Sequence, residues 1–186
     1  METKFKDLTN YIISLGAADV SHSEKTYLAH AIGVYNDMKA WNGTDELCRA
    51  ALFHSIYGTQ GFQGFTLPLE RQPELRGLIG DYAEKIAYLN CFMDRDSLDA
   101  QITQPEGPYT IIHRVTREKI VLSKQEYEDL IRVHLCDWLE QLPRDKKWDY
   151  RRQAYRQMAE RLGGIALTSY DKVFALEPKP AYQQNG

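Results

Sequence analysis

The 186-residue chain has little cysteine and no long apolar run. Its three cysteines, Cys48, Cys91 and Cys136, lie far apart and without C-x-x-C spacing. Such a set argues against a disulfide framework and against a zinc–thiolate site, and each cysteine lies in an apolar helical pattern typical of a small core residue. No window is apolar for long enough to span a bilayer, and the first residues have no basic start followed by the apolar run of a secretory signal. We therefore expect a cytoplasmic protein that does not associate with membranes.

The chain also lacks a strong excess of either charge. Its formal net charge of −3 gives no sign of a nucleic-acid-binding surface, so nucleic acid is not an expected partner. Hydrophobic residues make up 43% and charged residues 26%, which is ordinary for a globular protein. The length suits one domain with a single substantial core. We predict a single domain over residues 1–178 and a flexible tail at 179–186.

Apolar residues at helical spacing predict that most of the chain is helical. Two short β-rich runs within residues 109–122, TIIHRV and KIVL, predict a small hairpin. The segment GTQGFQGFTLP and residues 94–108 have the composition of loops. The predicted fold class is therefore all-α with a small β-hairpin insert. We predict helices over 5–15, from a Ser21–Glu24 capping box to about 41, from the Thr44 cap through His54, from Pro73 to about 92, from a Ser123–Glu126 capping box through Asp137, and over about 148–162.

Three residues that could bind a metal ion lie in apolar segments. They are His30 in TYLAHAIGVY, His54 in CRAALFHSIYGT and Asp137 in IRVHLCDWLEQL. A buried carboxylate is costly unless it is paired or bound to a metal. Two imidazoles and one carboxylate can form a three-ligand face on a metal and leave positions for substrate or water. Each residue alone also has a simpler explanation, as a hydrogen-bonded core histidine or as an Asp paired with an Arg, and the pattern leaves both possibilities open.

The order of these motifs resembles the HD superfamily of metal-dependent phosphohydrolases. The segment VHLCDWLEQL is similar to the late Asp motif of the alarmone hydrolases, a branch of that superfamily. The segments SHSEKTYLAHAIGVY, ALFHSIYGTQGF and LRGLIGDYAEKIAYLNCFMDR resemble an HD-like bacterial family of unknown function with the same His-Ser-x-Tyr-Gly-Thr stretch. The resemblance covers most of the chain. It implies an HD-domain-like helical bundle in which His30, His54 and Asp137 bind one divalent metal ion, such as manganese, iron or zinc.

Ser55 departs from the superfamily pattern, which has an Asp ligand at this position. A neutral hydroxyl is a much weaker ligand for a hard divalent cation than a carboxylate, and it cannot bridge two metals. We therefore expect a mononuclear site. The resemblance implies a metal-dependent hydrolase acting on a small, phosphorylated or nucleotide-like substrate. The alternatives are an iron-dependent HD-type oxygenase and a catalytically inactive domain that binds a small ligand or a partner protein.

Further polar residues are candidates for the same site. Glu84 could act as a general base, and the planar fork of Arg76 could bind a phosphate or carboxylate. For at least one of these two residues we expect surface ion pairing instead, and Tyr57 could equally belong to the core. We expect a pocket that opens towards the GTQGFQGF loop. The predicted catalytic residues are His54, Ser55 and Glu84, and the predicted substrate-binding residues are His22, Tyr57, Thr59 and Arg76.

Overall fold

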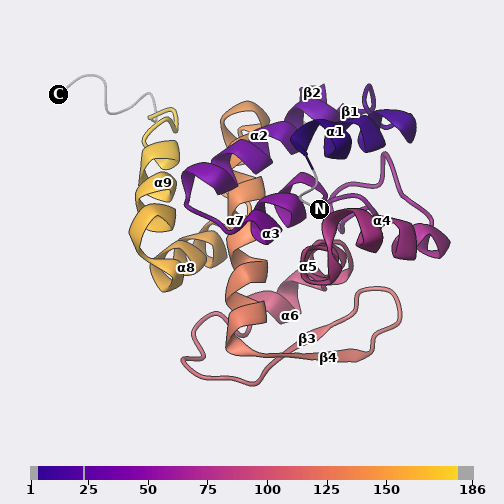
Figure 1. Ribbon diagram of the computed structural model, residues 1–186. Coiled ribbons are helices and arrows are strands. Elements are labelled where there is room, and N and C mark those ends of the chain that lie inside the picture. Colours follow the sequence, from indigo (N-terminus) through magenta and orange to yellow (C-terminus); the bar gives the residue numbers. More distant parts are fainter. Residues whose placement is uncertain (1–3, 23, 180–186) are drawn as a thin grey trace.

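The computed structural model describes residues 4–22 and 24–179. This part of the chain contains nine α-helices and two small antiparallel sheets (Figure 1). The structure thus confirms the predicted fold class, mostly α with a small hairpin. The predicted tail lies almost wholly in 180–186, outside the described residues. The helices are α1 (Phe5–Ser14), α2 (Tyr27–Ala40), α3 (Asp45–Leu52), α4 (Gln72–Ile79), α5 (Asp81–Phe92), α6 (Arg95–Asp99), α7 (Lys124–Asp145), α8 (Arg152–Leu162) and α9 (Gly164–Phe174).

Helix α7 is the centre of the fold. It packs against α2, α3, α5, α8 and α9, and Figure 1 shows α8 and α9 on one side of it and α4 and α5 on the other. Ser123 and Glu126 form the predicted capping box at its start. Most of its next turns are buried, among them the polar residues His134 and Asp137. A helix that is buried nearly all round belongs in a core, so its polar side chains must find partners within the protein.

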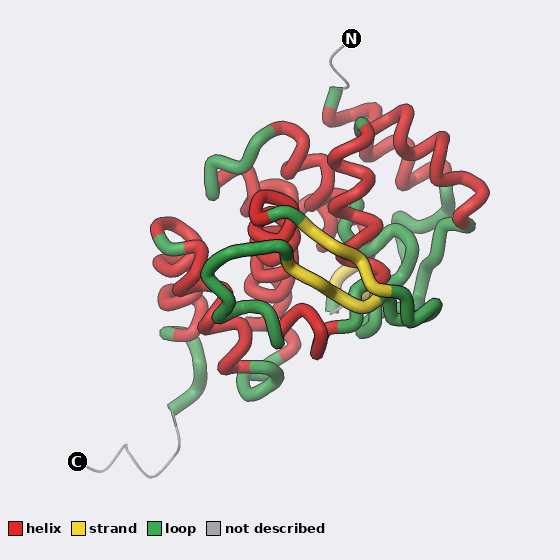
Figure 2. The backbone as a smooth tube through the Cα atoms, turned by 90° about the horizontal axis from the view of Figure 1, so that it is seen from below, coloured by secondary structure: helices red, strands yellow, loops and turns green. Residues whose placement is uncertain are grey.

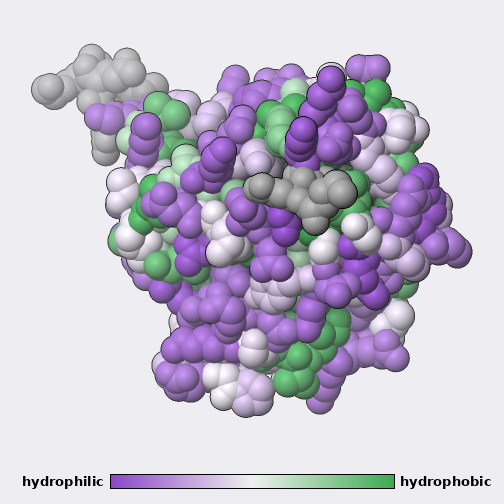
Figure 3. All heavy atoms as spheres, in the orientation of Figure 1, coloured by the Kyte–Doolittle hydropathy of each residue, from purple (hydrophilic) through white to green (hydrophobic). Residues whose placement is uncertain are grey.

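The predicted hairpin is confirmed. Strands β3 (Tyr109–Ile112) and β4 (Lys119–Leu122) pair antiparallel, with Tyr109 opposite Leu122; Figure 2 shows the two strands side by side across the helices. On the face seen in Figure 3 hydrophilic residues predominate, and a small apolar patch gathers at the level of this hairpin. The three cysteines are free and buried, as expected. None of the described helices has the length and apolarity needed to cross a bilayer.

The start of α2 differs from the prediction. Ser21 and Glu24 do not cap a helix; instead β1 (Ser21–His22) pairs antiparallel with β2 (Lys25–Thr26), and Glu24 adopts φ +61°. The cap is Thr26, whose hydroxyl accepts a hydrogen bond from the backbone N–H of Ala29. Both Ser21 and Thr26 are cap-type residues, but Thr26 directly precedes the apolar stripe. The pairing of β1 with β2 places His22 against α2, where its ring stacks on that of His30.

Three other boundaries were also predicted incorrectly. The helix expected from Pro73 to about 92 is interrupted at Gly80, which has φ +92° and ψ 156°, a conformation open essentially only to glycine. Residues 95–99 form the short helix α6, because the side chain of Asp94 accepts the N–H of Ser97. The last predicted helix begins only at Arg152. Gly163 ends it as expected, but α9 begins immediately afterwards and packs against α7 and α8.

The break at Gly80 gives a test of the fold with an internal control. Replacing Gly80 with Ala should lower the free energy of unfolding by about 1–3 kcal/mol, because a Cβ strains this backbone conformation. Replacing Gly77 with Ala should raise it by about 0.5–1 kcal/mol, because Gly77 is an exposed position inside α4 with open space around it. Denaturant unfolding of both variants measures the difference. Equal effects at the two positions would contradict the described break.

Candidate metal centre

The three predicted metal ligands meet in the core, although they are 24 to 107 residues apart in sequence. His30 comes from α2, Asp137 from α7, and His54 from the turn after α3 rather than from the helix itself. His30 Nε2 lies 3.2 Å from His54 Nε2 and 3.0 Å from Asp137 Oδ1, and His54 Nε2 lies 3.3 Å from the same oxygen. All three residues are buried. This cluster could bind a metal ion.

Both imidazole rings are oriented by hydrogen bonds at Nδ1. His54 Nδ1 lies 2.7 Å from the carbonyl oxygen of Ala51, which can only accept, so this nitrogen carries the hydrogen. That carbonyl belongs to the last turn of α3 and has no partner within the helix. His30 Nδ1 in turn donates to Glu140 Oε2 at 2.5 Å. Both rings therefore direct Nε2 at Asp137, in the arrangement found for metal-binding histidines.

Charges in this cluster are strongly coupled. Burial alone would raise the pKa of Asp137, but the imidazoles of His54 and His30 hold that pKa well below its ordinary value. Burial also opposes the charged form of His30, yet its bonds to Asp137 and Glu140 raise its pKa to about 9. His30 thus carries a proton on Nε2 that points at Asp137. A metal ion that binds here must displace that proton, so binding should release protons and strengthen as the pH rises towards 9.

The donor set fits a single divalent ion. Separations of 3.0 to 3.3 Å between the three donor atoms correspond to ligand–metal–ligand angles of roughly 90–105° for an ion about 2.1 Å from each atom. These angles lie between octahedral and tetrahedral values. Two neutral imidazole nitrogens and one carboxylate suit zinc, iron or manganese, and three protein ligands leave positions for other molecules.

Glu140 is the main functional residue that the sequence analysis missed. Its side chain is only 6% exposed, one turn after Asp137 on α7, and it is held by His30, by Lys25 at 2.7 Å and by Arg144 at 2.7 Å. These contacts outweigh its burial and lower the pKa of Glu140 to about 2, so it is a carboxylate. Gly33 makes room for it, since a Cβ there would lie 2.6 Å from Glu140 Oε1. Two features of the sequence point to Glu140. It lies three residues after Asp137, and the helix that carries His30 contains a glycine, Gly33, at the position that faces it.

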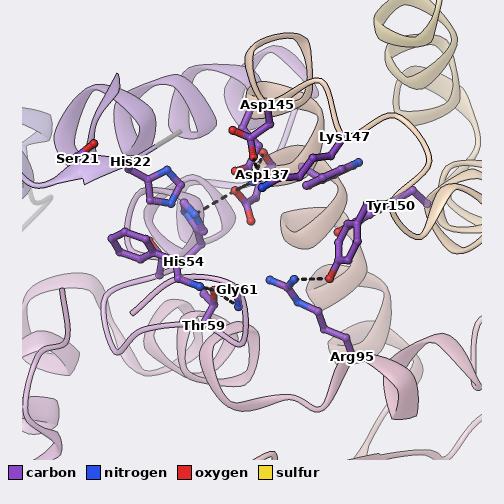
Figure 4. A pocket seen from close by; sticks show the side chains of 15 residues that line it. Ser21, His22, His54, Thr59, Gly61, Arg95, Asp137, Asp145, Lys147 and Tyr150 are labelled. Atoms are coloured by element: carbon purple, nitrogen blue, oxygen red, sulfur yellow. Dashed lines mark hydrogen bonds and ion pairs between the residues drawn. The ribbon is translucent and has the colours of Figure 1, made fainter. Parts of the chain in front are cut away.

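A pocket of about 550 Å³ lies over the cluster and reaches the predicted Gly-rich loop (Figure 4). His54, Ser55 and Asp137 form part of its wall, as do the predicted substrate-binding residues His22 and Thr59. His30 lies behind them. The pocket also contains residues from α6, α7, α8 and the segment between α7 and α8 that the sequence analysis did not assign to it, because no recognisable motif marks them. These are Arg95, Trp138, Gln141, Asp145, Lys147, Tyr150 and Tyr155.

Two polar side chains of the pocket have unused hydrogen-bonding atoms. His22 stacks on His30 with ring centres 4.2 Å apart, and its buried Nδ1 has no hydrogen-bond partner among the described residues. Burial and the neighbouring His30 lower the pKa of His22 to about 4, so the ring is neutral at physiological pH. The hydroxyl of Ser55 is also buried; the Tyr27 hydroxyl lies beside it, and Ser55 keeps capacity for a further hydrogen bond. Both groups are available to water or to a bound molecule.

The structure places Glu84, Tyr57 and Arg76 in a separate cluster. The buried Glu84 carboxylate accepts hydrogen bonds from Tyr57 at 3.0 Å, from Gln72 at 2.9 Å and from Arg76 at 3.3 Å. Glu84, Gln72 and Arg76 line a shallow hollow between α4 and α5, and none of the cluster lines the pocket over Asp137. Since Glu84 already accepts three hydrogen bonds, these contacts explain its burial as part of the packing of α4 on α5.

His134 supports the cluster indirectly. Its Nδ1 lies 3.2 Å from Asn90 Oδ1, and Asn90 donates in turn to the carbonyl oxygen of His54 at 2.8 Å. On its other side, Nε2 accepts a hydrogen bond from Arg151 at 2.8 Å. Burial, and next the charge of Arg151, keep the pKa of His134 well below its ordinary value. The neutral ring therefore connects α8 to the turn that carries His54.

Comparison with known proteins adds one match. A family model described as a domain of unknown function (DUF6817) matches residues 11–95. That segment contains His30, His54 and Ser55, whereas Asp137 and Glu140 lie beyond it. No curated protein and no solved structure matches the chain. The assignment of function therefore depends on the geometry of the site.

The role of Glu140 can be tested by metal affinity. Replacing Glu140 with Gln should weaken zinc or manganese binding about 10- to 100-fold, because it removes the charge that orients His30. Glu84→Gln is the matched control, a buried carboxylate in the other cluster, and should leave the affinity unchanged. Competition with a chromogenic chelator measures both, after circular dichroism has verified folding. Equal losses in the two variants would contradict a specific role for Glu140.

Proposed function

We propose that the protein is a metal-dependent hydrolase of the HD type, acting on a small phosphorylated or nucleotide-like molecule at a mononuclear site. The observation that carries the proposal is the convergence of His30 Nε2, His54 Nε2 and Asp137 Oδ1 beneath an open pocket. Three such donors from three segments of the core are difficult to explain by packing alone, because two ring nitrogens and a carboxylate oxygen aimed at one point compete for a single proton. A metal ion satisfies all three.

The motif resemblance supports the same assignment. In this proposal His30, His54 and Asp137 hold the ion, and the DUF6817 match covers the first two. The bound ion would polarise a phosphoryl oxygen and lower the pKa of a water molecule. Glu140 fixes the ring of His30. Gln141 donates to Asp137 Oδ1 at 3.0 Å, which fixes the carboxylate.

The neutral side chains of the pocket would orient the reactants. His22 Nδ1 is buried without a partner among the described residues, and the Ser55 hydroxyl, beside that of Tyr27, keeps capacity for a further hydrogen bond, so each can bind a water molecule or the substrate. Ser55 occupies the place of the superfamily's second-motif Asp. Its lack of charge favours one ion over two, because a hydroxyl does not offset the repulsion between two dications.

A second candidate is an iron-dependent oxygenase. The donor set of two histidines and one carboxylate is the one that non-haem iron(II) oxygenases use, and the structure supplies that set. A third candidate is a ligand-binding domain without catalysis, which is favoured by the serine at position 55. The identity of the bound element separates the three possibilities.

Elemental analysis of protein purified without a histidine tag tests the proposal. We expect about one manganese or zinc per chain, little metal in His54→Ala and Asp137→Asn, and metal-dependent release of phosphate from a panel of phosphomonoesters and nucleotides. Chelation should abolish the activity and re-addition of the metal should restore it. His113→Ala is the control, because this histidine lies on the hairpin, away from the pocket. Iron would favour the oxygenase, and failure to retain any metal after reconstitution would contradict both enzyme assignments.

A further inference from the structure

Arg95 places a guanidinium group at the edge of the pocket with no anionic partner. It donates to the hydroxyl of Tyr150 at 2.8 Å, and among the described residues no carboxylate lies within ion-pair distance of it. Figure 4 shows the guanidinium directed into the pocket, facing the side that carries His54 and Thr59. A half-buried guanidinium whose one side-chain hydrogen bond is to a neutral hydroxyl retains several free N–H donors.

Local structure holds Arg95 in this position. The side chain of Asp94 caps α6, and the backbone N–H of Arg95 donates to Gln60 Oε1 at 3.0 Å. The guanidinium packs over Gly61, where an added Cβ would lie 3.1 Å from both terminal nitrogens. Two contacts therefore fix the side chain of Arg95: packing against Gly61 of the Gly-rich loop and the hydrogen bond to Tyr150. A donor that is already ordered loses less entropy when it binds a ligand.

The charge balance of the pocket points to an anionic ligand. Its walls contain two cations, Arg95 and Lys147, and two carboxylates, Asp137 and Asp145. Lys147 is largely exposed and pairs with Asp145 at 3.4 Å. With a divalent ion bound, the pocket would carry a net positive charge, and Arg95 would be the cation without a carboxylate of its own.

We propose that Arg95, positioned by Tyr150 and Gly61, binds the phosphate group of the substrate opposite the His30–His54–Asp137 cluster, with Lys147 as the second cation. This inference rests on the proposed function. Planar guanidinium groups bind phosphate oxygens in pairs, which a lysine cannot do. The remaining space is bounded by the stacked rings of Trp138 and Tyr155, whose centres are 5.0 Å apart. A pocket of about 550 Å³ with an aromatic wall accommodates a phosphate attached to a flat or apolar group.

Calorimetric titration of the metal-loaded protein with inorganic phosphate tests this role. We expect one phosphate per chain, at least about tenfold weaker binding in Arg95→Gln, and partial retention in Arg95→Lys. Tyr150→Phe keeps the guanidinium and should lose no more than about threefold. Arg71→Gln makes the same charge change outside the pocket, where Arg71 pairs with Glu74, and should have no effect. Metal content should be the same in all five proteins.

Several results would overturn the proposal. Unchanged phosphate affinity in Arg95→Gln would do so, as would the absence of phosphate binding to the wild type. A loss in Tyr150→Phe as large as in Arg95→Gln would show that the guanidinium only anchors the loop of Tyr150. Failure of the proposed hydrolase function can be distinguished from failure of the Arg95 proposal, because in the first case the wild-type protein would contain no metal. If such metal-free protein still bound phosphate in an Arg95-dependent way, the role of Arg95 would stand.

Discussion

The burial of the Asp137 carboxylate is the constraint on which the rest of this structure depends. An isolated charge in a helical core costs several kcal/mol, so its neighbours must offset that cost. His30 and His54 do so directly, and Gln141 adds a hydrogen bond. His30 requires in turn a second buried carboxylate, Glu140, which is held by Lys25 and Arg144. The polar interior is thus a chain of dependent contacts that joins α2 and α7 to the turn after α3.

The same contacts set the chemistry of the pocket. Because both histidines donate through Nδ1, their Nε2 atoms face one point beneath the open cavity. The cations of the pocket, Arg95 and Lys147, come from segments that follow α5 and α7. A metal ion on one side and a guanidinium on the other would hold a phosphorylated substrate from two directions, with neutral hydrogen-bonding groups between them. The proposed hydrolase requires this arrangement, with the metal ion on one side of the substrate and the Arg95 guanidinium on the other.

The helical fold, the hairpin and the three residues of the central cluster could be predicted from the sequence, because apolar periodicity identifies both the helices and the polar residues that interrupt their buried faces. The boundaries at Thr26 and Gly80 could not be predicted, since tertiary packing decides between competing caps and selects the glycine-only conformation.

Glu140 was missed because an acidic residue in a helix is usually exposed. Arg95 was missed because its orientation is set by tertiary contacts with Gly61 and with Tyr150, which is 55 residues away. Glu84 has the residue type of a general base, but contacts from α4 place it in another cluster.

The most direct test of the central claim is a crystal structure of the metal-reconstituted protein with anomalous diffraction measured at the absorption edge of the metal. We expect one strong anomalous peak per chain, about 2.0–2.3 Å from His30 Nε2, His54 Nε2 and a carboxylate oxygen of Asp137. The Nδ1 contacts of both histidines should be unchanged. A site without a peak, with His30 still donating to Asp137, would contradict the central claim, as would a metal bound elsewhere on the chain.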